Sequence, residues 1–60
     1  MKTIFLDDDG NEIKTVNEPI NLSVGDCVWG IRLKDSTVHS VTLVAYSFYD
    51  NAMVIQLNKE

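Results

Sequence analysis

Apolar and β-branched residues gather in short runs that are separated by turn-forming residues, and none of these runs follows a helical period. Residues 2–6 and 12–16 are two such runs, and they flank the dipeptide Asp9-Gly10. An Asp-Gly pair between two strand-like runs is a strong signal for a β-hairpin. We therefore predict that the chain begins with a hairpin.

The register of this hairpin depends on the length of its loop. A two-residue Asp9-Gly10 loop sets Leu6 opposite Ile13, whereas a three-residue loop with Gly10 in the left-handed conformation sets Phe5 opposite Ile13. We favour the two-residue loop, and both registers stay open at this point.

A connector and a corner follow the hairpin. Pro19 cannot donate a ladder hydrogen bond, which marks residues 17–21 as a connector. At the corner, Gly25 can take a positive φ and Asp26 can accept hydrogen bonds from the turn amides. We predict that a strand over residues 27–32 starts here, with a bulge or bend at Gly30.

The C-terminal third is the richest in strand-forming residues. Residues 33–37 are polar and turn-like, residues 38–46 form the longest β-branched run, and we interpret this run as the central strand. A turn over 47–51 and a last strand over 52–58 complete the pattern. Simple alternation places these side chains on one face of each strand: Val41, Leu43 and Ala45, then Met53, Ile55 and Leu57.

The pattern as a whole predicts an all-β protein. No stretch repeats apolar residues at helical spacing over three turns. We expect a single domain over residues 1–60, made of five short antiparallel strands. An N-terminal hairpin plus a three-strand meander would form a small, partly open barrel or a strongly bent sheet.

The corner and the last strand carry a resemblance to a known class of fold. Val24-Gly25-Asp26-Cys27-Val28, followed by a meander that ends in residues 53–57, resembles the pattern of SH3-like small barrels. The resemblance covers about residues 22–57. It implies a small barrel and no particular activity, because one fold supports many functions.

The length of the chain limits how it can be stabilised. A 60-residue domain buries roughly 60% of the surface of its unfolded chain, so it often needs a disulfide, a metal or a partner. Cys27 is the only cysteine, which excludes an intrachain disulfide. With His39 as the only histidine, a structural zinc site lacks ligands, and we expect no metal or cofactor. Self-association or partner binding remains.

Charge narrows the class of partner. Five Lys and Arg against nine Asp and Glu give a net charge of −4, which repels phosphate backbones and anionic membranes. The apolar run at residues 2–6 is too short for a signal peptide or a membrane span. We expect a soluble, cytoplasmic protein that does not bind a membrane and for which nucleic acid is the less favoured partner.

Three consecutive carboxylates precede Gly10 and suggest calcium. The spacing does not fit an EF-hand, because Phe5 and Val16 would occupy the first and last ligand positions. We interpret the cluster as a solvated hairpin tip that could address a basic surface on a protein partner. Its residues are Asp7, Asp8 and Asp9.

The residues that could support catalysis do not form a catalytic pattern. His39 and Ser40 are adjacent in a strand and point to opposite faces, so His39 cannot activate Ser40. We predict that His39 is a surface residue and that Cys27, in an apolar strand, is a buried and inert thiol. We therefore expect no enzymatic activity.

The aromatic residues are the most suggestive feature for binding. They come from three segments that a small barrel could bring to one edge, and such an edge suits a protein partner or stacked bases. We predict that the corner turns the chain so that these side chains converge, and for Trp29 both a place in the core and a place at an interface stay open, with the core favoured. These aromatic residues are Trp29, Tyr46, Phe48 and Tyr49.

The apolar content of the C-terminal third supports a binding role. Thirteen of the twenty residues in 38–57 are apolar, more than one small interior can hold. Our leading hypothesis is a non-enzymatic protein-binding module that self-associates and acts as an inhibitor or adaptor, as small acidic accessory proteins of phages and mobile elements do. The alternative is a small-ligand or nucleic-acid-binding barrel that uses the aromatic edge.

Overall fold

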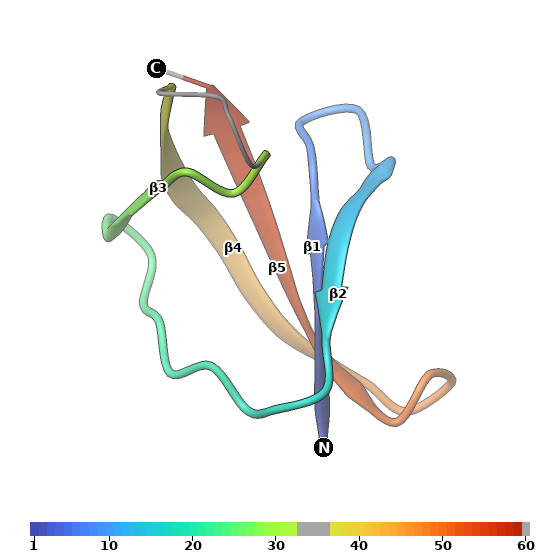
Figure 1. The fold of residues 1–60 in the computed structure, drawn as a ribbon. Coiled ribbons are helices and arrows are strands. Elements are labelled where there is room, and N and C mark those ends of the chain that lie inside the picture. The colour runs from blue at the N-terminus through green and yellow to red at the C-terminus, as the bar shows by residue number, and fades with distance from the viewer. Residues whose placement is uncertain (33–36, 60) are drawn as a thin grey trace.

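Five strands form one sheet that curls into a half-barrel (Figure 1). The computed structural model describes residues 1–32 and 37–59. These residues contain no helix, and so none that could cross a membrane. The sheet order is β2-β1-β5-β4-β3. The strands are β1 (Lys2–Leu6), β2 (Glu12–Val16), β3 (Cys27–Trp29), β4 (Val38–Ser47) and β5 (Ala52–Lys59).

The N-terminal hairpin has the predicted strands but neither of the predicted registers. Leu6 pairs with Glu12 and Phe5 pairs with Lys14, so Ile13 is the extra residue of a β-bulge. The cause lies in the loop, where the Asp7 amide donates to the Asn11 carbonyl at 2.8 Å and closes a five-residue connection. Because this loop is longer than either expected one, the bulge takes up the offset.

Gly10 shapes this loop through its backbone. Its φ is +86°, a left-handed value that L-residues adopt only at a cost, and open space surrounds the position of a Cβ. We expect Gly10→Ala to lower the free energy of unfolding by about 1 kcal/mol through backbone strain alone. Gly10→Asn should cost less, because Asn tolerates the left-handed region. Urea denaturation of the three proteins tests this, and equal losses for Ala and Asn would contradict it.

The hairpin joins the rest of the sheet through a parallel pair. β1 runs parallel to β5, with Ile4 beside Val54 and Phe5 beside Ile55. The prediction of a wholly antiparallel sheet is therefore wrong at this pair. The central strand of the sheet is therefore β5 and not β4. The hairpin pairs with the edge of β5 that does not pair with β4, and so it extends the meander.

The corner before β3 is confirmed. Gly25 has a φ of +99°, and the Asp26 carboxylate accepts a hydrogen bond from the Ser23 amide at 2.8 Å. The corner is fastened to β4 because the Gly25 amide donates to the Val41 carbonyl at 2.9 Å. The strand that follows ends at Trp29, earlier than predicted, where Gly30 turns left-handed with a φ of +75°. The turn predicted at 33–37 lies mostly outside the described residues.

A bulge in β4 reverses the alternation of its side chains. Val41 pairs with Leu57 and Leu43 pairs with Gln56, so Thr42 is the extra residue. As a result Val41 is buried, whereas Leu43 and Ala45 lie on the opposite face and are exposed. The prediction that these three residues share a face is wrong, because simple alternation does not anticipate a bulge.

The hydrophobic core lies on the inner face of the curl. Its members come from three strands and from the segment after β3. The linker between β2 and β3 crosses the open side, where Ile20 and Leu22 pack against the core. A buried Thr3 hydroxyl holds this linker, donating to the Glu18 carbonyl at 2.9 Å and accepting from the Ile20 amide at 3.1 Å. The core residues are Phe5, Ile31, Val41, Ile55 and Leu57.

Candidate functional site

The outer face of the sheet carries an apolar band across its three middle strands. Ile4, Val54 and Ala45 stand side by side on β1, β5 and β4, and Gln56 stands between Leu6 and Leu43 in the neighbouring row. Leu43 and Ala45 are exposed, and the other apolar members are half-buried. We call this surface the outer apolar band. It consists of Ile4, Leu6, Leu43, Ala45 and Val54.

Opposite charges flank the outer apolar band along β1. Lys2 and Leu6 alternate with the inward-facing Thr3 and Phe5, so Lys2 lies on the outer face at one end of the strand. Glu12 pairs with Leu6 on β2 and lies on the same face at the other end. The band is thus an uncharged centre between a cation and an anion.

The turn between β4 and β5 presents two aromatic side chains on a fixed backbone. The Ser47 hydroxyl donates to the Asp50 carboxylate at 3.0 Å and accepts from the Asp50 amide at 3.1 Å. The Tyr46 hydroxyl donates to the Asn51 side chain, and its ring meets the Phe48 ring edge-on with centroids 4.9 Å apart. Phe48 is nevertheless 90% exposed and Tyr49 98% exposed. A turn held in this way can bind a partner through Phe48 and Tyr49 with little loss of conformational entropy. We call residues 46–51 the aromatic turn.

Trp29 does not join the aromatic turn. It pairs with Val38 at the start of β4, whereas Tyr46 lies near the opposite end of this ten-residue strand. Trp29 is 71% exposed and lies on the outer face, away from the core. The predicted convergence of the four aromatic residues is therefore wrong, because the corner pairs β3 with the beginning of β4 instead of its end.

The acidic hairpin tip is a structural turn. One Asp7 carboxylate oxygen accepts hydrogen bonds from the amides of Asp9 and Asn11, at 2.9 and 2.8 Å. Asp8 and Asp9 are exposed, and side-chain oxygens of all three aspartates lie within 4.8 Å of one another. Asp7 thus orders the tip, while Asp8 and Asp9 remain exposed.

Cys27 and His39 occupy the opposite environments to those predicted. Cys27 is exposed and pairs with Ser40, whereas His39 is only 4% exposed and pairs with Val28 on the inner face. The two side chains therefore point to opposite sides of the sheet and cannot act as a nucleophile and its base. His39 and Ser40 also lie on opposite faces, as predicted.

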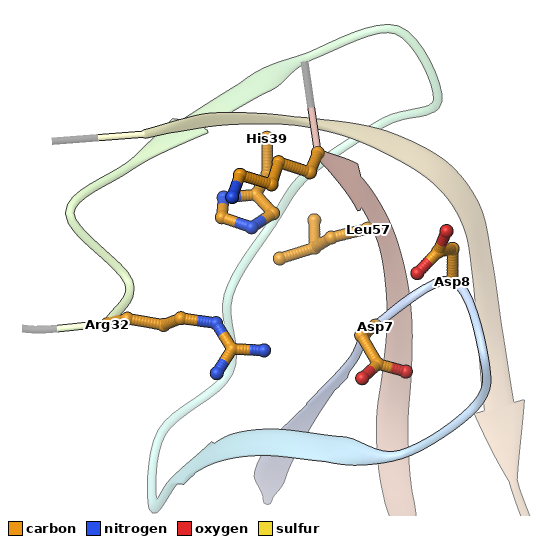
Figure 2. A pocket seen from close by; sticks show the side chains of 6 residues that line it. Asp7, Asp8, Arg32, His39 and Leu57 are labelled. Atoms are coloured by element: carbon orange, nitrogen blue, oxygen red, sulfur yellow. The ribbon is translucent and has the colours of Figure 1, made fainter. Parts of the chain in front are cut away.

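A pocket of about 310 Å³ lies at the end of the half-barrel near the hairpin tip (Figure 2). It lies between the β1–β2 turn, the segment after β3, and the paired ends of β4 and β5. Among the described residues, its lining combines two carboxylates with three nitrogen-bearing side chains and one apolar residue. The lining residues are Asp7, Asp8, Arg32, His39, Leu57 and Lys59.

Sequence reasoning missed this pocket. The basic residues are dispersed along the chain, and no local pattern places Arg32 beside the end of β5. A usable signal existed for His39, which precedes Val41 by two residues and so shares its buried face. Lys59, one residue beyond the predicted end of the last strand, belongs to β5 and pairs with His39.

Comparison with known proteins adds no family to this description. No protein family, no curated protein and no solved structure shows significant similarity to the chain. Its function is therefore argued from the residues above.

Proposed function

We propose that the chain is a small, non-enzymatic, cytoplasmic protein-binding module that pairs with a second copy of itself through the outer apolar band. The observation that carries this proposal is the band itself, an uncharged apolar surface across three hydrogen-bonded strands. In the pair, the aromatic turn stays exposed and docks on another protein, which the module inhibits or recruits.

The burial of the C-terminal third supports a binding role. Of the thirteen apolar residues in 38–57, only four are buried. Six are exposed, and these are Val38, Leu43, Ala45, Tyr46, Phe48 and Tyr49. Leu43 and Ala45 belong to the outer apolar band and Phe48 and Tyr49 to the aromatic turn, and exposed apolar surface gathered in such patches is typical of an interaction site.

A second copy suits the outer apolar band because the band is self-complementary. If two copies stack with a two-fold axis across the strands, Lys2 of one copy lies near Glu12 of its partner, and the uncharged centres meet. The band is small compared with a standard interface of about 800 Å² per partner. We therefore expect a dissociation constant on the order of 10 μM.

We predict that Leu43→Lys abolishes self-association. Leu43 is 44% exposed, so the lysine should fold normally but place an ammonium group in the apolar contact. Sedimentation equilibrium over a range of concentrations should give a dimer for the wild type and a monomer for the variant. Val24→Lys is the matched control, because Val24 is also apolar, is 65% exposed and lies outside the band.

A second variant separates the outer apolar band from the aromatic turn. The double variant Phe48→Ser/Tyr49→Ser should remain dimeric, since the proposal assigns these residues to a different partner. A wild-type monomer at high micromolar concentration would overturn self-association. A dimer that survives Leu43→Lys but not the double variant would show that the pair forms through the turn instead.

The resemblance to SH3-like barrels stays a prediction. The Gly25-Asp26 corner and the three-strand meander support it. The parallel β1·β5 pair is a feature that the resemblance did not supply.

A further inference from the structure

The pocket beside the hairpin tip separates its charges. Asp7 and Asp8 belong to the β1–β2 turn, and Arg32 and His39 come from the other side of the half-barrel. Figure 2 shows the two carboxylates on one side, the guanidinium and imidazole groups facing them, and Leu57 between the two sides. Within the described part of the chain, no ion pair joins these carboxylates to Arg32 or Lys59.

The basic side of the pocket suits an anionic group. Of the five Lys, Arg and His residues that the structure describes, three line this one pocket. Arg32 follows the buried Ile31, and Lys59 pairs with His39 across β4 and β5, so the backbone fixes where all three begin. A guanidinium, an ammonium and an imidazole N–H are the donors that bind carboxylates and phosphates.

His39 contributes a donor because of its own burial. Its Nδ1 atom is buried and has no hydrogen-bond partner. In a neutral imidazole one nitrogen donates and the other accepts, and an unpartnered buried acceptor is less costly than an unpartnered buried N–H, so the tautomer with its proton on Nε2 is favoured. Figure 2 shows the ring extending from β4 into the pocket, so the distal Nε2–H points at the space a ligand would fill.

The acidic side of the pocket is held rigidly. One oxygen of Asp7 is fixed by the amides of Asp9 and Asn11. The Gln56 side chain donates to the Asp7 carbonyl at 3.2 Å and reaches the Asp8 carbonyl at 3.5 Å, which ties the turn to the central strand. The backbone of the turn and the Asp7 carboxylate are therefore held opposite the basic side, where Asp7 and Asp8 would bind a cationic group.

We propose that this pocket binds a small zwitterion, a molecule with a carboxylate or phosphate at one end and a protonated amine at the other. Arg32, His39 and Lys59 hold the anionic group, and Asp7 and Asp8 hold the amine. A pocket of about 310 Å³ is at the small end of ligand sites, which suits a compact metabolite. The site lies on the inner face, so it is independent of the outer apolar band.

Titration followed by amide NMR tests the proposal. The probes are γ-aminobutyrate and phosphoethanolamine as zwitterions, with inorganic phosphate and butylamine as their separate halves. We expect saturable shifts at the pocket for at least one zwitterion, with each half binding about tenfold more weakly. Comparing the two zwitterions distinguishes carboxylate from phosphate.

Variants on each side of the pocket complete the test. Arg32→Gln and Asp8→Asn change exposed residues and should each weaken the zwitterion about tenfold, while Arg32→Lys should recover part of the loss. Lys14→Gln and Glu18→Gln, which are outside the pocket, should leave zwitterion binding unchanged, and Leu43→Lys should bind the zwitterion normally.

Two results would overturn the proposal. One is the absence of pocket shifts with either zwitterion at about 10 mM, which corresponds to binding too weak to be specific. The other is phosphate that binds as tightly as phosphoethanolamine and more tightly to Asp8→Asn, which would identify a plain anion site.

Discussion

Replacing Leu57 with alanine should remove most of the stability of this domain. Leu57 is fully buried on β5, where it pairs with Val41 in the core. A buried Leu→Ala change costs about 3 kcal/mol, from lost transfer energy and the cavity left behind. A 60-residue domain has roughly 5 kcal/mol in total, so about 2 kcal/mol should remain, and about 3% of the variant should be unfolded at room temperature without urea.

Leu43→Ala is the matched control for this change. The two leucines lie on neighbouring strands, but Leu43 is 44% exposed and Leu57 is 0% exposed. Urea denaturation at about 1 μM protein, below the expected dissociation constant, removes any contribution of self-association. We expect Leu43→Ala to lose less than about 1 kcal/mol. Equal losses for both variants would show that the inner face is not the main core.

The strands of this fold could be predicted because their signals are local. Asp9-Gly10 between two apolar runs gave the hairpin with its strands at the observed residues. Gly25 and Asp26 gave the corner, since a positive φ and a short acidic side chain are properties of those residues themselves. Elements whose conformation depends on adjacent residues in the sequence could therefore be predicted.

The faces of the strands could not be predicted in the same way. Each bulge inserts one residue, and all side chains beyond it change sides. The extra Thr42 moves Leu43 and Ala45 from the core to the outer face. The outer apolar band is therefore a product of the bulge. Simple alternation would place Leu43 and Ala45 in the core instead.

The pocket depends on contacts that are more distant still. The parallel β1·β5 pair brings the hairpin tip to the end of the half-barrel where β4 begins and β5 ends. Asp7 and Lys59 are 52 positions apart in the sequence and line the same pocket only because of this pairing. Charged residues that are dispersed along the sequence are thus brought together by the sheet topology, and no sequence motif marks them.

A single side chain of β1 supplies two of the hydrogen bonds that hold the linker between β2 and β3. The linker has no strand of its own, yet Ile20 and Leu22 from it cover the open side of the core. The fully buried Thr3 hydroxyl bonds to the Glu18 carbonyl and to the Ile20 amide at once. A hydroxyl that serves as donor and acceptor in this way leaves two backbone groups unpaired if it is removed.

We therefore expect Thr3→Val, which keeps the shape of the side chain, to lower the free energy of unfolding by about 2 kcal/mol. Thr15→Val is the matched control, because the exposed Thr15 hydroxyl bonds only to the Glu12 carboxylate, and its loss should cost less than about 0.5 kcal/mol. Hydrogen exchange locates the effect, since the Ile20 amide should lose protection in Thr3→Val but not in Thr15→Val. If the Ile20 amide keeps its protection in Thr3→Val, the hydrogen bond to Thr3 is not needed to protect it. Packing of Ile20 and Leu22 would then be enough to hold the linker.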